Sequence, residues 1–283
     1  MVAGKRMGLT KSFPVLHKMD MTIGVRQYIK AAVKRFLWAH GLDIQWKLSG
    51  HPDFPDFPAD FGREEIEIIR GVSPFSLTSK ENLFALIEAV RHVVRFNIPG
   101  AIVECGVWRG GSMMAAAKTL TMLNCYDRDL YLFDTFEGMV APTEKDVNVL
   151  GETGQDVIEM NKTAGPDGSD LLAVPLEEVK KNLYQVGYDN GRIRFVKGRV
   201  QDTLPDQAPD QIAVLRLDTD WYESTRHELI HLFPGLSRGG ILILDDYGMW
   251  LGQRRAVDEY LQEHNLGQFL ARVSRGMRIG VKE

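Results

Sequence analysis

Short apolar runs alternate with helix-length segments from residue 78 to the end of the chain. The apolar runs are AIV ending at Glu104, LYLF ending at Asp134, RIRFV ending near Lys197, IAVLRL ending at Asp218, and GILIL ending at Asp245 and Asp246. Helix-length segments lie at 111–123, at 175–187 and over STRHELIHLFPGL. Strands that alternate with helices are joined by right-handed crossovers. The pattern predicts an α/β fold with a mainly parallel sheet covered by helices on both faces.

Two further patterns flank this alternation. Thr78 and Glu81 form a potential capping box ahead of an amphipathic helix over NLFALIEAVRHVVRFN. The tail QFLARVSRGMRIGVKE is interpreted as two strands joined at Arg275 and Gly276. We therefore expect a helix before the first strand and a closing hairpin on one edge of the sheet.

The first 62 residues have a different pattern. RQYIKAAVKRFLWAHGL has apolar residues at helical spacing among lysines and arginines, and HPDFPDFPADFG then excludes helix and strand because of its repeated prolines. The helix is expected to pack on its own domain or on a second subunit, with a membrane or partner contact as the alternative. We predict a basic helical segment with a linker or extended arm at 1–62, and one domain at 63–283.

Composition narrows the function classes. The 283 residues carry a formal charge of −4, and residues 1–50 hold nine Lys and Arg against two Asp, a balance of +7 that leaves −11 for the rest. This acidic body argues against nucleic acid as a partner. No apolar run approaches the roughly 20 residues of a membrane span. Two cysteines without metal spacing suit a reducing compartment, so we expect a cytoplasmic protein.

The segment from Gly138 to about Pro175 is too long for an ordinary connection between a strand and a helix. It is rich in Gly, Asp, Thr and Glu. Insertions at the ligand edge of a sheet are often lids or substrate walls. Composition leaves two hypotheses open, a lid or wall and an insertion without function.

A glycine turn follows the first strand, with Gly106, Gly110 and Gly111 in ECGVWRGGS. The spacing departs from the G-x-G-x-x-G of dinucleotide sites, and Trp108 occupies a position where a pyrophosphate would need close backbone approach. Asp134, 30 residues after Glu104, ends the next strand and is placed to accept from ribose hydroxyls. The pattern indicates a nucleoside site.

A second set of carboxylates follows the later strands. Asp218 lies in LRLDTDWYEST, and Asp245 and Asp246 lie one βαβ unit later. Clustered carboxylates repel one another unless a cation lies among them, and oxygen-only ligands favour Mg²⁺, then Mn²⁺ or Ca²⁺. Asp220 is expected to cap the next helix, with a role as a fourth ligand as the alternative. His227 and His231 could pair on a metal, but we expect packing or surface roles because no third ligand is in view.

Several motifs together resemble the macrocin and mycinamicin-type sugar O-methyltransferases (TylF-like). They are FSLTSKENL, IPGAIVECGVWRGGSMMAAA, LYLFDTFEGM, GRVQDTLP and LRLDTDWYESTRHELIHLFPGLSRGGILILDDYG, and the resemblance covers roughly residues 70 to 260. It implies a Rossmann-like class I methyltransferase sheet, S-adenosylmethionine and Mg²⁺ as cofactors, a glycoside or glycan substrate, and a homo-oligomer. One departure is Thr219, where the family commonly has glycine.

The resemblance also implies roles for individual residues. Glu104, Gly106 and Gly110 would hold the methionine moiety, Asp134 would accept from the ribose, and Ser79 lies in a segment that folds over the cofactor. Residues beside the adenine would be Gly198, Val200, Asp202 and Thr203. Mg²⁺ ligands would be Asp218, Asp245 and Asp246, with Asp218 also the candidate general base.

The expected function is O-methylation of a sugar hydroxyl of a glycosylated natural product or a glycan. A divalent cation stabilises a developing alkoxide, and a nearby carboxylate can accept the proton. Two alternatives stay open. An NAD-dependent oxidoreductase would need the dinucleotide fingerprint and a Tyr-x-x-x-Lys or comparable catalytic pair. A non-catalytic nucleoside-binding scaffold would act through its basic N-terminal helix.

Overall fold

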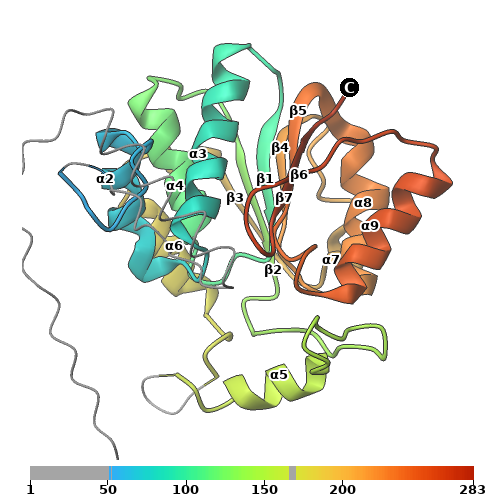
Figure 1. Cartoon of the computed structure of the whole chain (residues 1–283). Coiled ribbons are helices and arrows are strands. Elements are labelled where there is room, and N and C mark those ends of the chain that lie inside the picture. The colour runs from blue at the N-terminus through green and yellow to red at the C-terminus, as the bar shows by residue number, and fades with distance from the viewer. Residues whose placement is uncertain (1–50, 52, 166–169) are drawn as a thin grey trace, which may run out of the picture.

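The computed structural model describes residues 51, 53–165 and 170–283, which form a seven-stranded sheet. The strand order is β3-β2-β1-β4-β5-β7-β6. β1 to β5 run parallel, and β7 pairs antiparallel with β5 and with β6 (Figure 1). Strand bounds are β1 Ala101–Cys105, β2 Leu130–Asp134, β3 Ile193–Lys197, β4 Ile212–Leu217, β5 Leu236–Leu244, β6 Ala271–Arg272 and β7 Arg278–Val281. This confirms the predicted parallel sheet and the closing hairpin.

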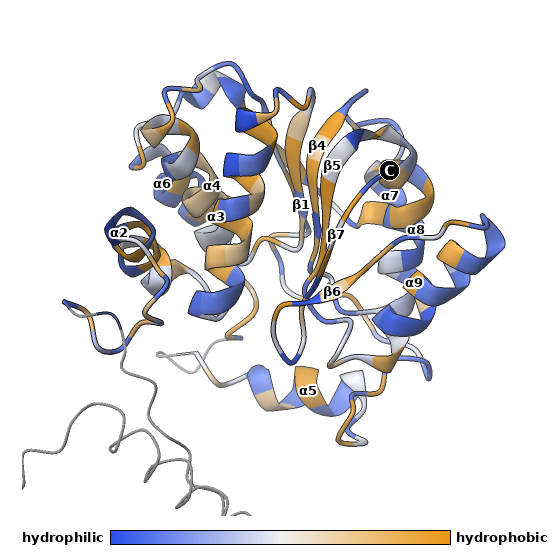
Figure 2. Cartoon of the chain, turned by 45° about the horizontal axis from the view of Figure 1, so that its top comes forward, coloured by the Kyte–Doolittle hydropathy of each residue, from blue (hydrophilic) through white to orange (hydrophobic). Residues whose placement is uncertain are grey.

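Helices cover both faces of the sheet (Figures 1 and 2). On one face are α2 Arg63–Val72, α3 Lys80–Arg95, α4 Gly111–Met122 and α6 Leu176–Tyr184; on the other are α7 Val200–Thr203, α8 Tyr222–Leu232 and α9 Leu251–Glu263. Neighbouring strand residues point to opposite faces, so Val214 of β4 packs into the core under the first group and Leu215 into the core under the second. All six residues of β4 are buried, as expected for a central strand.

Short 3₁₀ helices lie at Ser73–Phe75, Asn190–Arg192 and Phe233–Gly235. The capping box predicted at Thr78 and Glu81 is wrong by one residue. Ser79 is the N-cap of α3, and its hydroxyl accepts from the backbone N–H of Asn82 at 3.2 Å. Thr78 is thereby left free to use its hydroxyl elsewhere.

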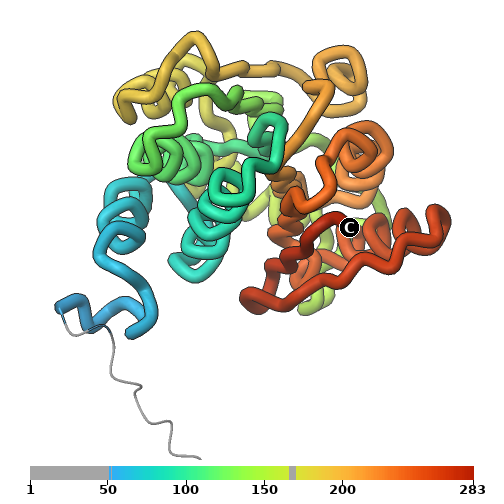
Figure 3. Tube along the Cα trace, turned by 90° about the horizontal axis from the view of Figure 1, so that it is seen from above, coloured from blue at the N-terminus to red at the C-terminus, as the bar shows by residue number. Residues whose placement is uncertain are grey.

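The described part of the arm before α2 packs on the body by its aromatic rings. Phe61 is buried and stacks on Phe84 of α3, with ring centroids 4.0 Å apart. The guanidinium of Arg70 lies 4.5 Å from the ring centroid of Phe54. Seen from above, this arm lies beside α2, on the side of the molecule away from the C-terminal hairpin (Figure 3). The predicted basic helix lies outside the described residues.

The segment between β2 and α6 extends beyond the carboxyl edge of the sheet and includes α5, Gly154–Asn161 (Figure 1). Its first half is anchored to the body. Asp146 is buried and accepts from the backbone N–H of Tyr222 at 2.7 Å, at the start of α8. None of the helices within the described residues is both long enough and apolar enough to span a bilayer.

Candidate functional site

A cavity of about 420 Å³ lies at the carboxyl edge of the sheet, where β1, β2, β4 and β5 end. Its lining comes from the glycine turn, the segment Phe75–Thr78, the insertion, and the loops that follow β4 and β5. Ligands bind at this edge in open parallel sheets because loops and helix N-termini converge there. The two predicted groups of acids therefore open onto one space.

The glycine turn between β1 and α4 has little room for side chains. Gly106 has a φ of +84°, and a Cβ atom there would lie 2.1 Å from the carbonyl oxygen of Asp218. Gly110 is the N-cap of α4 and also has a left-handed backbone, with φ +88°. Glycine is needed at both positions because other residues adopt this conformation at a cost. The turn is thus built directly against the loop that carries Asp218.

Asp134 holds this turn in place. Its Oδ2 accepts from the backbone N–H groups of Val107 at 2.6 Å and Trp108 at 3.3 Å, and its Oδ1 accepts from Phe136 at 2.7 Å. The sequence instead predicts that Asp134 accepts hydrogen bonds from the hydroxyls of a ribose. The hydroxyl of Thr135 also lies 3.4 Å from Oδ1, but it donates over a shorter distance to the carbonyl of Gly138, at 2.5 Å. Asp134 lines the cavity, so a ligand hydroxyl can take this weakest place on the carboxylate.

The predicted cofactor residues divide into two sets. Those that line the cavity are Gly106, Asp134, Gly198 and Val200. Those that do not are Ser79, Glu104, Gly110, Asp202 and Thr203. The second set therefore lies outside the lining of the cavity.

The second set has other contacts. The carboxylate of Asp202 is 66% exposed and lies 3.8 Å from Arg199, and the hydroxyl of Thr203 donates to the carbonyl of Arg199 at 3.1 Å. Ser79 caps α3. These three residues therefore shape the segments that border the cavity without facing it.

A buried arginine that the sequence analysis missed joins the two acid groups. Arg216, in β4, donates from Nη1 to Glu104 Oε1 at 2.5 Å and to Asp218 Oδ2 at 2.7 Å. Its Nη2 lies 2.9 Å from Asp245 Oδ1 and donates to the Thr78 hydroxyl at 3.0 Å. The chain itself thus supplies a positive charge among Glu104, Asp218 and Asp245. A charged residue inside the apolar run IAVLRL was the available signal, since a buried charge needs partners.

Glu104 is buried beneath the glycine turn, with 1% of its surface exposed. Burial raises the pKa of Glu104 to about 7, although the guanidinium of Arg216 opposes this shift. Its Oε2 atom is buried and has no hydrogen-bond partner among the described residues. An unpartnered acceptor next to the turn suits a ligand that brings a positively charged donor.

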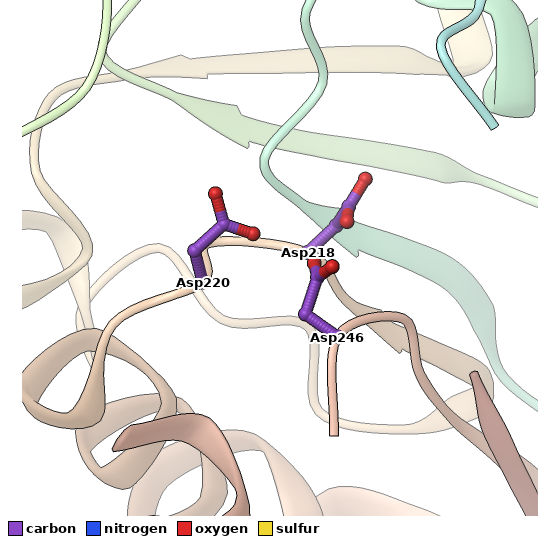
Figure 4. A group of neighbouring side chains, drawn as sticks. All are labelled: Asp218, Asp220 and Asp246. Carbon is purple, nitrogen blue, oxygen red and sulfur yellow. The ribbon is translucent and has the colours of Figure 1, made fainter. Parts of the chain in front are cut away.

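Three carboxylates gather at the other side of the cavity, from Asp218, Asp220 and Asp246 (Figure 4). One oxygen of each lies within 4.8 Å of the others. Asp245 lies outside this group and contacts Arg216 and the Asn82 amide, the latter at 3.4 Å. Two of the three predicted metal ligands are therefore in the group, and Asp220 takes the third place.

The prediction that Asp220 caps the next helix is wrong. Trp221 is the N-cap of α8 and makes no side-chain cap bond; the acceptor at this helix start is Asp146. Asp220 has a left-handed backbone with φ +64°, so its side chain turns toward the other acids (Figure 4). This backbone conformation is uncommon outside glycine, although Asp and Asn adopt it more often than most residues.

The acid group is electrostatically unfavourable, because Arg216 pairs with only one of its three carboxylates, Asp218. Burial raises the pKa of Asp218 and of Asp246 well above the usual range, and it raises the pKa of Asp220 to about 7. Repulsion among the carboxylates adds to each shift. Three oxygen donors in this state fit a hard divalent ion, which would compensate the repulsion. The residues present therefore fit Mg²⁺.

His227 and His231 lie side by side on α8, with ring centroids 4.3 Å apart. Within the described residues, no cluster of potential metal ligands includes either ring. His227 Nε2 lies 3.4 Å from the carbonyl oxygen of Leu204. The expected packing role agrees with these contacts.

Two indoles hold the insertion over the cavity. Trp108 of the glycine turn donates from Nε1 to the carbonyl of Leu171 at 2.9 Å. Trp221 of the acid loop donates from Nε1 to the carbonyl of Val140 at 3.0 Å. Both loops that line the cavity thus bind the insertion, which forms one wall of it.

Comparison with known proteins gives relatives over most of the chain. The family model described as Macrocin-O-methyltransferase (TylF) matches residues 70–277. The demethyldecarbamoylnovobiocin O-methyltransferase of Streptomyces niveus is 35% identical over 188 residues, which are 66% of this chain and 68% of that protein. The 8-demethyl-8-(2,3-dimethoxy-alpha-L-rhamnosyl)-tetracenomycin-C 4'-O-methyltransferase of Streptomyces olivaceus is 35% identical over 185 residues, which are 65% of this chain and 66% of that protein.

The solved structure of the O-methyltransferase NovP is similar to the whole described fold. It matches with a TM-score of 0.65 at 28% identity and covers 91% of this chain and 98% of that chain. The sheet, its edge hairpin and the helices on both faces therefore follow a methyltransferase architecture.

Proposed function

The chain belongs to the macrocin O-methyltransferase (TylF) family of S-adenosylmethionine-dependent enzymes, and from this premise we propose that it methylates a sugar hydroxyl with the help of Mg²⁺. The acceptor would be a glycosylated natural product or a glycan. One observation carries the proposal: a single cavity has the glycine turn on one side and the buried acids Asp218, Asp220 and Asp246 on the other. A donor and an acceptor hydroxyl can meet in such a space.

The glycine turn is the proposed donor half of the site. S-adenosylmethionine supplies the methyl group. Gly106 and Gly110 let the backbone of the turn approach the donor closely, and Asp134 fixes the turn and would accept from a ribose hydroxyl. Glu104 lies buried beneath the turn, where its unpartnered Oε2 would favour a cationic amino group bound at the turn. Gly198 and Val200 would border the adenine, with Asp202 and Thr203 supporting that segment from behind.

The acid loops are the proposed metal half. We assign Mg²⁺ to Asp218 and Asp246, two members of the close group, and to Asp245, which lines the same cavity next to Asp246 in the chain. Asp220, the third member of the group, is then left to accept a proton. Asp245 also lines the cavity, and only its Oδ1 is engaged by Arg216 and Asn82. When bound, the cation supplies positive charge that favours ionisation of a nearby hydroxyl.

The geometry favours Asp220 over Asp218 as the general base. Oδ2 of Asp218 accepts from Arg216, and the same carboxylate is an assigned metal ligand, so less of it is open to a hydroxyl proton. Asp220 has no ion-pair partner within the part of the chain that the structure describes, and it lines the cavity beside Asp246. A carboxylate in this position can accept a proton from an acceptor hydroxyl.

The remaining task of the chain is to position the reactants. Trp108 and Trp221 hold the insertion as a wall, and Arg216 fixes the acid loop against the donor half. Holding two reactants in the productive geometry replaces an encounter in solution. This can lower the activation barrier by several kcal/mol. We propose the insertion as the acceptor wall for this reason.

A sugar acceptor is supported by the relatives. The Streptomyces olivaceus protein is named for a rhamnosyl group that it methylates at the 4' position. Because the relatives compared above are O-methyltransferases, they favour S-adenosylmethionine over the NAD of the alternative hypothesis. The retained acids argue against a non-catalytic scaffold, since buried carboxylates are costly unless they have a function.

A direct assay tests the proposal. The full chain is incubated with methyl-labelled S-adenosylmethionine, Mg²⁺ and a panel of deoxysugar glycosides, and transfer to each acceptor is counted. We expect labelled product with at least one glycoside. Absence of transfer across a broad panel, with S-adenosylhomocysteine binding intact, would count against the sugar acceptor.

A further inference from the structure

A single buried hydrogen bond ties the acid loop to helix α8. The hydroxyl of Thr219 donates to Oε1 of Glu228 at 2.8 Å. Glu228 has no exposed surface, and Thr219 is its one hydrogen-bond partner among the residues that the structure describes. A carboxyl group is costly to bury in a helix that faces the core, so its position in α8 calls for a function.

The loop that this bond holds is short and conformationally demanding. Thr219 lies between Asp218 and Asp220, and its carbonyl accepts from the backbone N–H of Trp221 at 2.7 Å. Asp220 has φ +64°. A rotation of the Thr219 peptide would therefore redirect the carboxylates on both sides of it.

The Thr219 side chain adds a contact that glycine cannot make. In this chain the threonine is paired with an acid nine residues later, on the facing side of α8. Glu228 has no ion-pair partner among the described residues, and its Oε2 has no hydrogen-bond partner there either. Among the described residues, the hydrogen bond between Thr219 and Glu228 therefore has one role, which is to hold the loop that carries Asp218 and Asp220.

We propose that Glu228 is a positioning residue, which through the Thr219 hydroxyl keeps the carboxylates of Asp218 and Asp220 aimed into the cavity. Glu228 does not touch the substrate. The inference rests on the proposed function, because the two aspartates are the proposed metal ligand and base. It predicts that losing either end of the hydrogen bond slows transfer, whereas the donor site, on the other side of the cavity, is unaffected.

A double-mutant cycle tests this. Thr219→Val removes the hydroxyl with little change in shape, and Glu228→Leu removes the acceptor. We expect each to lower kcat about tenfold, the factor that corresponds to one lost buried hydrogen bond, with KM for S-adenosylmethionine changed less than about twofold. The double variant should be no slower than either single variant, because both remove the same interaction.

Two conservative variants separate positioning from folding. Thr219→Ser keeps the hydroxyl and Glu228→Gln keeps an acceptor oxygen, so both should retain wild-type kcat while Thr219→Val does not. If Glu228→Leu fails to fold, the comparison of Thr219→Ser with Thr219→Val still decides. Equal kcat in wild type and Thr219→Val, or losses that multiply in the double variant, would overturn the inference. Absence of transfer by the wild type would instead overturn the proposed function.

Discussion

The guanidinium of Arg216 lies 2.7 Å from the carboxylate of Asp218, two residues further along the chain. The same guanidinium bonds Glu104, which is 112 residues away in sequence. Arg216 is therefore the physical link between the glycine turn and the acid loop. Because Arg216 is buried, this link is costly to break. Removing the guanidinium would leave several carboxylates without a counter-charge.

Replacing Arg216 should destabilise the protein severely. We expect Arg216→Met to lower the free energy of unfolding by about 3–5 kcal/mol, the usual cost of removing one partner of a buried ion pair. The matched control is Arg255→Met, which breaks the Arg255–Glu259 pair on the surface of α9 and should cost less than about 1 kcal/mol. Urea unfolding of both variants measures the difference. Equal small losses would mean that Arg216 does not organise the site.

Asp218→Asn should abolish methyl transfer while leaving the donor site nearly intact. The change removes a proposed metal ligand, but the glycine turn and Asp134 remain as they are. Calorimetric titration with S-adenosylhomocysteine should give an affinity within about threefold of wild type, a difference of less than 1 kcal/mol. Asp206→Asn, which changes an exposed residue outside the cavity lining, is the control for transfer. Activity that survives in Asp218→Asn would contradict the metal assignment.

Asp245 and Asp220 should respond differently to removal of charge. Asp245→Asn is expected to weaken binding of Mn²⁺, a spectroscopic substitute for Mg²⁺, by at least about 10-fold, because even loss of an outer-shell partner costs about 10- to 100-fold. Asp220→Asn should keep the Mn²⁺ affinity within a few fold and lower kcat by about 10²- to 10⁴-fold, the contribution of a general base. Paramagnetic resonance titration and turnover distinguish the two. The reverse pattern would make Asp220 the ligand, as the carboxylate spacing also permits.

Glu228 should give the fold a measurable pH dependence. Burial raises the pKa of Glu228 to about 8, against a smaller opposing effect of the Thr219 hydroxyl. The protonated form therefore stabilises the fold below the unfolded pKa, near 4.3, and this contribution is lost as pH rises through about 8. Glu228→Gln cannot ionise and keeps its stability.

Thermal melting of wild type and Glu228→Gln between pH 5 and pH 9 measures this effect. The stability of Glu228→Gln should rise relative to that of the wild type as pH rises, by a few kcal/mol at most in the free energy of unfolding. A difference that stays constant over this range would contradict the raised pKa of Glu228.

The sheet and its carboxyl edge could be predicted from the sequence because burial leaves a local pattern. Parallel strands such as β4 are buried on both faces and therefore form continuous apolar runs. Asp218 and Asp245 come directly after two such runs, and Asp246 follows Asp245, so topology alone brings them to one edge. The alternation of strands with helices likewise places Glu104 and Asp134 at the carboxyl edge of the sheet.

The details of the site depend on contacts that no local pattern encodes. Arg216 was included in an apolar run, since its partners Glu104 and Asp245 are distant in sequence. The direction of Asp220 follows from its left-handed backbone, which the sequence does not indicate for a residue after a strand. The side chain that accepts from the first N–H of α8 is Asp146, from an insertion that composition could not place.

Metal-dependent transfer is the central claim, and chelation tests it most directly. The enzyme is treated with EDTA, desalted, and assayed with labelled S-adenosylmethionine and the glycoside that gave product, with and without added Mg²⁺. Our account predicts that transfer falls to background in the depleted enzyme, returns when Mg²⁺ is added, and does not return in Asp218→Asn. Full transfer by the depleted enzyme without added metal would contradict it.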